Sequence, residues 1–479
     1  MKLKTLAIAC ALACTSQAYA LDINTTPVTA STVKMFVSGS SALQTMLGQT
    51  ASAIMDSATI DVYFDGTTAA PSTGKNYRAY YGKVKDTTDF TTYPDLETAS
   101  GSGIGKNLII YETALGGSTQ GVYPVAGSTY GTVSRLSMAN CGAASVGTDS
   151  ATGRPLWNCN TGTAGTTVVA VPDAGISDVE PATLAASING GTGSVPDGLV
   201  ISGIQGVVMG LVTTTGSPFT NLTKPQATGL MGGNIADWSV IDPAATNKSV
   251  IVCRRVAGSG TQAAINASFF GQPCSTGALS PLTYLATTAP LGSSTAVAAG
   301  NVVVVENSSS GNVKTCMAAA KLGTAAGAFT GALGAINVKN GNLVAAGTAN
   351  SVVLPAGGYA VGVLGLDGGT TSNYQFASIN GVAATTENAA TGAYDVVVEA
   401  TMQDRGDLTG ATAAAYALFK QFSGDPAILG VSGAGGTPVP GVAALSENGW
   451  PVSTPFDPAM PVLRVGNFGN TCQPLSTLQ

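Results

Sequence analysis

Histidine is absent from all 479 residues, and this absence excludes several kinds of site. Without an imidazole there is no Ser-His-Asp or Cys-His nucleophile pair, no histidine zinc ligand and no imidazole general base. Charge is also scarce, because only 10% of the residues are charged, against about 25% in an ordinary soluble domain. The formal net charge of −6 offers no basic surface to nucleic acid or to an anionic membrane, so we expect neither as a partner.

Long apolar runs are missing after the first twenty residues, so we expect no transmembrane segment in the mature chain. Residues 1–20 themselves have the pattern of an export signal. Lys2 and Lys4 precede an apolar stretch, and Ala18-Tyr19-Ala20 is a small-residue cleavage site, which predicts a mature chain starting at Leu21. A lipoprotein attached through Cys14 is the poorer alternative. We therefore expect a periplasmic or secreted protein.

Six cysteines remain after cleavage of the signal, and an even number in an exported chain predicts three disulfide bonds. They allow fifteen pairings, so the sequence leaves the connectivity open. Pairing of nearest neighbours predicts Cys141–Cys159, Cys253–Cys274 and Cys316–Cys472. There is no C-x-x-C motif, and we expect no metal site and no cofactor.

Strand and helix patterns alternate along the chain, which predicts an α/β fold with sheets flanked by helices. Apolar and β-branched runs predict strands at Val33–Val37, Leu108–Tyr111, Thr166–Val171, Val207–Val212, Val250–Cys253, Val302–Val305, Tyr359–Leu364 and Tyr394–Glu399. Helical spacing is found at Leu43–Met55, Gln262–Phe270 and Ala413–Phe422. Stretches rich in Gly, Ser and Thr near 65–105, 123–165, 275–300 and 340–350 are predicted to be surface insertions.

The segment from Val250 to Thr261 has the clearest chemistry. A predicted strand ends at Arg255, and Gly258-Ser259-Gly260-Thr261 opens a predicted helix. Unpaired backbone N–H groups at a helix start, together with two hydroxyl groups, form a cradle for a tetrahedral oxyanion. Arg255 adds a bidentate cation for the same anion. The alternative is an ordinary capped helix start with a surface arginine.

Three further polar segments occur where a strand leads into a turn or helix. They are Ser38–Ala42, Gly116–Val122 and Gly175–Pro181. Each has an ordinary alternative as a helix cap or turn, and Asp178 in the third segment is of a residue type common at helix N-caps. Their order along the chain therefore carries more information than any one of them.

In this order the segments resemble the phosphate-binding periplasmic proteins of bacterial phosphate ABC importers, a family of type 2 periplasmic solute-binding proteins. The most specific match is Arg255 followed by Gly258-Ser259-Gly260-Thr261, which resembles the family's Arg-x-x-Gly-Ser-Gly-Thr. Ser118–Val122, Gly175–Asp178 and Gly206–Val208 also resemble family segments. The likeness covers most of the mature chain, interrupted by insertions.

The resemblance implies two α/β lobes with mixed sheets, joined by two hinge crossovers. Lobe one would comprise 21–208 and 366–479, and lobe two 209–365. The implied ligand is inorganic phosphate or a similar oxyanion held in the cleft, and the implied partner is an ABC permease. Carried over residue by residue, the implied binding residues are Ser41, Ala42, Ser118, Asp178, Arg255, Ser259, Gly260 and Thr261.

Asp178 would select phosphate over sulfate. An ionised carboxylate only accepts hydrogen bonds, and phosphate near neutral pH keeps a P–OH donor that sulfate lacks. A bond from that donor is worth about 1.5–3 kcal/mol. Arg255 would supply most of the compensating charge.

Two other functional classes are compatible with the composition. The low charge and the abundance of glycine, alanine and threonine are also found in secreted surface or matrix proteins, so a structural protein on the same scaffold is the main alternative. A phosphate-ester hydrolase is disfavoured because the chain has no histidine and no clear metal cluster. We therefore expect a binding protein and not an enzyme.

Overall fold

The computed structural model describes most of the chain after the predicted signal. The described residues are 27–65, 76–86, 90–98, 104–142, 144–149, 152–159, 167–246, 248, 250–275, 277–279, 302–322, 336–338, 342–343, 359–430 and 439–477. The predicted signal at 1–20 and most of the expected insertions near 275–300 and 340–350 lie outside these residues. None of the helices in the described ranges is long and apolar enough to cross a membrane.

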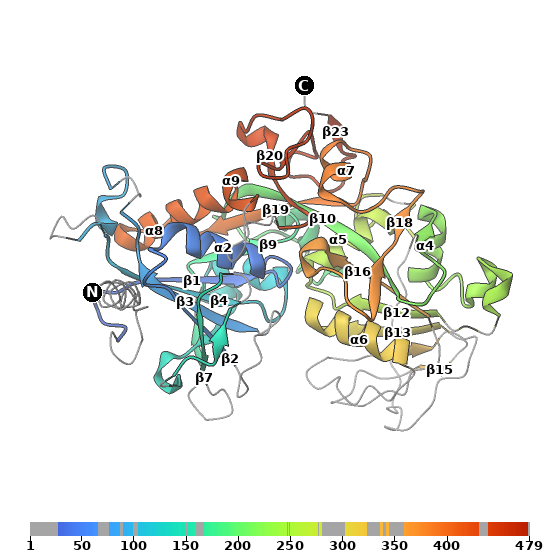
Figure 1. The fold of residues 1–479 in the computed structure, drawn as a ribbon, viewed down its shortest axis with the longest axis horizontal. Coiled ribbons are helices and arrows are strands. Elements are labelled where there is room, and N and C mark those ends of the chain that lie inside the picture. Colours follow the sequence, from blue (N-terminus) through green and yellow to red (C-terminus); the bar gives the residue numbers. More distant parts are fainter. Residues whose placement is uncertain are drawn as a thin grey trace, which may run out of the picture.

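A large mixed sheet, here called the first sheet, forms one side of the molecule (Figure 1). Its spatial strand order is β6 (Gly147–Thr148), β7 (Pro155–Cys159), β2 (Asp61–Asp65), β3 (Tyr77–Lys83), β4 (Asn107–Thr113), β1 (Val33–Gly39), β9 (Ala174–Ser177), β19 (Val397–Asp404), β10 (Val200–Thr214), β20 (Val442–Leu445) and β21 (Val462–Leu463). Strand β1 is parallel to both β4 and β9, so the carboxyl ends of β1 and β9 lie at the same edge. That edge carries the loops with Ser40 and Asp178.

Helices α2 (Gln44–Ile54), α8 (Gly410–Ser423) and α9 (Pro426–Leu429) cover one face of the first sheet. Met46 and Leu47 of α2 are buried in the same core as Leu418 and Phe419 of α8. The opposite face has its own aromatic core, in which the rings of Tyr63 and Trp157 stack. This half of the molecule is the first lobe.

The second sheet builds the other half, the second lobe. Its strand order is β17 (Tyr374–Phe376), β10, β16 (Tyr359–Gly365), β12 (Val250–Arg255), β13 (Val302–Asn307), β14 (Ile336–Val338) and β15 (Asn342–Leu343). Helix α6 (Ser310–Leu322) packs on one face, and α4 (Lys224–Met231) and α5 (Gly260–Phe270) pack on the other. Strand β10 belongs to both sheets, because residues 200–208 pair with β19 and residues 209–213 pair with β16. The predicted α/β class, with mixed sheets flanked by helices, is confirmed.

Two regions predicted to be surface insertions contribute strands to the first sheet. Strand β3, within 65–105, pairs along its whole length with β4, and its Tyr80 and Tyr81 are fully buried. Strand β7, within 123–165, pairs with β2, and the indole of Trp157 donates to the Asp61 carboxylate at 2.7 Å. The prediction was wrong because these short strands, which carry aromatic residues, lie between loops rich in small polar residues and glycine.

The cysteine pairing differs from the nearest-neighbour prediction at two of three bonds. Cys141 pairs with Cys159 as predicted, but Cys253 pairs with Cys316, and Cys274 pairs with Cys472. Cys253 is on β12, and the packing of α6 on the second sheet brings Cys316 to it. The chain neighbour Cys274 follows α5, which covers the opposite face. The last predicted strand is also shifted, since β19 begins at Val397 and not at Tyr394.

The remaining elements are short. Two-stranded sheets pair β5 (Val133–Leu136) with β8 (Thr167–Ala170), β11 (Asn221–Leu222) with β18 (Ser378–Ile379), and β22 (Val465–Gly466) with β23 (Ser476–Thr477). Short α-helices are α3 (Pro181–Ala185) and α7 (Thr386–Ala390). Single 3-10 turns connect the other elements, and the turn at Ser118–Gly121 takes part in the candidate site.

Candidate functional site

A buried hydrogen-bonded cluster around Asp178 lies where the two lobes touch. Asp178 directly follows β9, and its carboxylate accepts hydrogen bonds from the hydroxyl of Ser40, in the loop after β1, and from that of Thr261, at 3.0 Å. Ser40 belongs to the first lobe and Thr261 to the first turn of α5 in the second. Asp178 is only 1% exposed. One carboxylate therefore joins hydroxyl groups from both lobes.

Ser118 makes a second connection between the lobes. Its hydroxyl oxygen accepts from the backbone N–H of Asp178 at 3.2 Å and from that of Gly260 at 3.1 Å. Gly260 begins α5, and a Cβ atom there would lie 2.4 Å from the Ser118 hydroxyl oxygen. Nearby, the backbone N–H of Thr119 donates to the carbonyl of Gly258 at 3.0 Å. Glycine is therefore required at 260 for the lobes to meet this closely.

Arg255, at the end of β12, is a buried cation held by neutral acceptors. Its guanidinium donates to the Asn307 carbonyl at 3.3 Å, to the Ser308 carbonyl at 3.0 Å and to the Ser310 hydroxyl at 3.1 Å. The residue is 2% exposed, and none of the ion pairs found among the described residues includes it. A buried charge without a close counter-ion is costly, so this position favours an anion.

Burial also shifts the pKa values of Arg255 and Asp178. Burial lowers the pKa of Arg255 to about 10, and the charge of Asp178 opposes this shift. Burial raises the pKa of Asp178, opposed by the hydrogen bond from Ser40 and then by the charge of Arg255. Each group is therefore stabilised by the other, yet desolvation is the largest influence on both. A charged ligand bound here would therefore change the pKa values of both groups.

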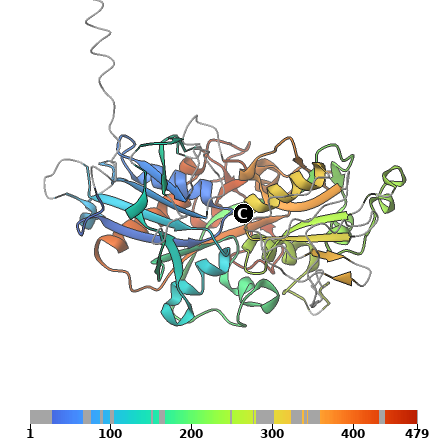
Figure 2. The same ribbon diagram turned by 90° about the horizontal axis from the view of Figure 1, so that it is seen from below.

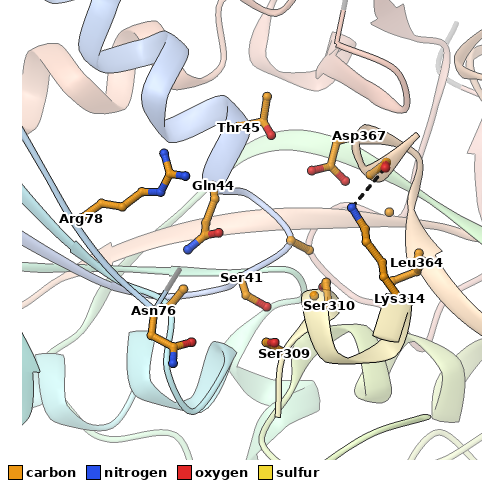
Figure 3. A pocket seen from close by; sticks show the side chains of 15 residues that line it. Ser41, Gln44, Thr45, Asn76, Arg78, Ser309, Ser310, Lys314, Leu364 and Asp367 are labelled. Atoms are coloured by element: carbon orange, nitrogen blue, oxygen red, sulfur yellow. Dashed lines mark hydrogen bonds between the residues drawn. The ribbon is translucent and has the colours of Figure 1, made fainter. Parts of the chain in front are cut away.

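Figure 3 shows a cavity of about 100 Å³. It adjoins the cluster, because its wall includes Ser41, which follows Ser40, and Ser310, which accepts a hydrogen bond from Arg255. Its wall comes from the loop before α2 and the first turn of α2, from β3 and the residue before it, from the residue after β4, from the start of α6, and from the end of β16 with the turn that follows. It is lined by Ser41, Ala42, Gln44, Thr45, Asn76, Arg78, Ala114, Ser309, Ser310, Gly311, Lys314, Leu364, Gly365, Asp367 and Gly368. Ser41 and Ala42 are the two predicted site residues in this wall.

Helix starts surround the cavity and the cluster. The N-cap residue of α2 is Leu43, which has no side-chain acceptor for the first-turn amides. By contrast, the Ser309 hydroxyl at the start of α6 accepts from the N–H of Asn312 at 3.2 Å, and the Ser259 hydroxyl accepts from the N–H of Gln262 at 3.4 Å. Ser259 thus adopts the ordinary capping role that the sequence left as the alternative. The helix starts add partial positive charge on both sides of the interface.

The structure brings four of the eight predicted residues into direct contact: Ser118, Asp178, Gly260 and Thr261. Arg255 is linked to the cavity wall through the Ser310 hydroxyl. Asp178 does not have the helix-cap role that the sequence left as the alternative, because its carboxylate accepts hydrogen bonds from hydroxyl groups of both lobes.

Sequence reasoning missed the charged residues of the cavity wall, which are Arg78, Lys314 and Asp367. The sequence contained a signal for Lys314. Ser308-Ser309-Ser310-Gly311 follows a β-branched strand in the same way as the other polar helix starts, and it places Lys314 one turn further on. Arg78 lies in a region that was predicted to be an insertion, and Asp367 lies in a short turn after β16.

No protein-family model and no curated protein matches the chain. Solved structures that match the chain include a candidate substrate-binding protein of a phosphate ABC transporter from Clostridium perfringens, solved with bound phosphate. It has 14% identity and a TM-score of 0.38, and the match covers 81% of this chain and 92% of that one. An ABC-type phosphate transport receptor from Vibrio cholerae has 16% identity and a TM-score of 0.30, over 52% of this chain and 74% of that one. A phosphate-binding protein from Stenotrophomonas maltophilia has 15% identity and a TM-score of 0.32, over 54% and 71%. At such low identity, the ligand of this chain has to be inferred from its own residues.

Proposed function

We propose that this chain is a solute-binding protein that captures inorganic phosphate, or a similar tetrahedral oxyanion, between its two lobes. One observation carries the proposal. Among the described residues, the hydrogen-bond acceptors of the buried Arg255 guanidinium are all neutral, and the guanidinium interacts with the charge of Asp178 in a cluster to which both lobes contribute donors. An oxyanion would place a counter-charge in direct contact with Arg255, which Asp178 does not, and would accept the hydrogen bonds of that cluster.

Binding would exchange contacts between the lobes for contacts to the ligand. When the lobes separate, the bond from the Gly260 N–H to Ser118 and the bond from the Thr261 hydroxyl to Asp178 are lost. These donors then become available to an anion, with the positive end of α5 behind Gly260. Each lobe holds only part of the donor set, so a bound anion favours closure.

Asp178 would act as the acceptor for a proton on the ligand. Its carboxylate now accepts two hydroxyl donors, and a phosphate P–OH group could replace one of them. Sulfate has no such donor and would bring like charge toward a buried carboxylate. The proposed ligand order is therefore phosphate before sulfate.

The proposed organisation follows from this ligand site. Residues 21–208 and 366–479 would form lobe one, residues 209–365 lobe two, and residues 1–20 an export signal that places the protein in the periplasm or outside the cell. An ABC permease would be the partner that receives the ligand. We propose binding without catalysis, because the chain has no histidine to serve as an imidazole base or nucleophile partner.

Calorimetry with inorganic phosphate tests the proposal, using protein that has been unfolded and refolded to remove endogenous ligand. Arg255→Gln should weaken phosphate binding by at least tenfold, since a hydrogen bond to a charged group is worth about 1.5–3 kcal/mol. Arg254→Gln is the matched control, because Arg254 is the adjacent residue of β12 and pairs with Glu306 at 2.8 Å. Absence of binding in the wild type, together with ordered arrays in electron micrographs, would instead favour a structural protein.

A further inference from the structure

We propose that the ligand is a phosphomonoester whose neutral, hydroxyl-bearing substituent fills the cavity beside the Arg255–Asp178 cluster. This inference rests on the proposed function, and it narrows the ligand from a bare oxyanion to a phosphorylated polyol. The phosphoryl group would occupy the cluster. The alcohol part would occupy the cavity that the structure leaves next to it (Figure 3).

The cavity adjoins the cluster, because wall residues are chain neighbours of Ser40 or accept a hydrogen bond from Arg255. Ser41 and Ala42 line the cavity and follow Ser40, which bonds the Asp178 carboxylate. On the opposite wall, Ser310 lines the cavity and accepts a hydrogen bond from the Arg255 guanidinium at 3.1 Å. A phosphoryl group held by Arg255 and Asp178 therefore has the cavity as its neighbour, and its ester oxygen would point into it.

The cavity provides space in addition to the cluster, and a bare anion bound in the cluster would not fill that space. A volume of about 100 Å³ is several times the roughly 10–15 Å³ that a cavity needs to hold one water molecule. A glycerol moiety has six non-hydrogen atoms and is a suitable occupant by this measure. Inorganic phosphate in the cluster would leave the whole cavity to water.

The chemistry of the wall fits hydroxyl groups better than a second anion. Arg78 is already paired with the buried Asp149 at 2.9 Å, so its charge is largely compensated. Lys314 and Asp367 approach each other on the wall, and the Lys314 ammonium donates to the Gly368 carbonyl at 3.1 Å (Figure 3). Each of these two charges offsets the other. A wall with carboxylate, ammonium and amide groups offers both acceptors and donors, and a hydroxyl group needs both.

Calorimetry of the wild-type protein with two probes tests the inference without any variant. Inorganic phosphate and glycerol 3-phosphate are titrated separately into ligand-free protein. We expect glycerol 3-phosphate to bind at least tenfold more tightly. If phosphate binds and glycerol 3-phosphate binds equally or more weakly, the inference is wrong and the proposed function stands. If neither binds, the proposed function fails and the inference fails with it.

Variants of the wall then locate the substituent. Asp367→Asn and Lys314→Met should each reduce the preference for glycerol 3-phosphate over phosphate by at least fivefold. Lys321→Met is the matched control, because Lys321 is on the same helix and its ammonium bonds the Ser372 carbonyl, away from the cavity. Equal losses of affinity for both probes would show that phosphate itself occupies the cavity and would overturn the inference. Circular dichroism of each variant verifies that it is folded.

Discussion

Replacement of Asp178 by asparagine probes the ligand selectivity predicted from the cluster. The carboxylate is 1% exposed, follows β9 and accepts the hydroxyl groups of Ser40 and Thr261. Asparagine keeps the size and one acceptor oxygen but removes the negative charge. The site should therefore keep its shape and lose the charge-assisted acceptor for a P–OH group.

The expected magnitude follows from the two ligands. Phosphate loses a charge-assisted hydrogen bond of about 1.5–3 kcal/mol, which corresponds to roughly 10- to 150-fold in affinity. Sulfate makes no such bond with the carboxylate, and it also loses the repulsion from a buried negative charge. The ratio of the phosphate and sulfate affinities should thus fall by at least tenfold, because the two changes have opposite signs.

Competition calorimetry at slightly alkaline pH measures this ratio. Asp173→Asn is the matched control, because Asp173 lies at the opposite end of β9 and accepts from the backbone N–H of Phe36 at 2.8 Å. It should leave the ratio unchanged. An Asp178→Asn protein that is folded and still discriminates like the wild type would refute the assigned role of Asp178.

Three further predictions test other parts of the structure. Peptide mapping without reduction should recover a Cys253–Cys316 peptide, and a Cys253–Cys274 peptide would show that α6 is misplaced on the sheet. Gly260→Ala should prevent the close contact with Ser118 and reduce phosphate affinity at least tenfold. Small-angle X-ray scattering should show that the variant is more open than the wild type. A variant with unchanged dimensions would argue against contact between the lobes at Gly260. Burial raises the pKa of Glu112 from 4.5 to about 7, so the folded protein retains a proton that the unfolded chain releases. Stability should decrease as the pH rises from 4.5 to 7, and Glu112→Gln should flatten this decrease in melting temperature; an identical slope would contradict it.

The sequence predicted those strands whose side chains are apolar on both faces. Val250–Cys253 and Val302–Val305 are continuous β-branched runs because each strand is covered by helices on both sides. It did not predict β3, whose tyrosines are buried at the centre of a sheet but carry no such run. Local pattern also fails for the cysteine partners, because the covering helix decides which cysteine reaches Cys253.

The candidate site, like the fold, was predicted only in part from the sequence. The Gly-Ser-Gly-Thr helix start was predicted as an anion cradle from its own residues, whereas Asp178 was included because the segment Gly175–Asp178 resembles a segment of the phosphate-binding family. Lys314 and Asp367 are single polar residues in otherwise ordinary segments, so only the packing of α6 and the turn after β16 identifies them as neighbours. The closed contact between Ser118 and Gly260 is likewise a property of the lobes together and of neither segment alone.

A crystal structure of the ligand-free protein soaked with phosphate tests the central claim most directly. We predict tetrahedral density within hydrogen-bonding distance of the Arg255 guanidinium, the Gly260 N–H and the Asp178 carboxylate, with the present bond from Gly260 to Ser118 replaced by bonds to the ion. Phosphate found elsewhere on the protein, with the bonds from Gly260 to Ser118 and from Thr261 to Asp178 unchanged, would contradict the account.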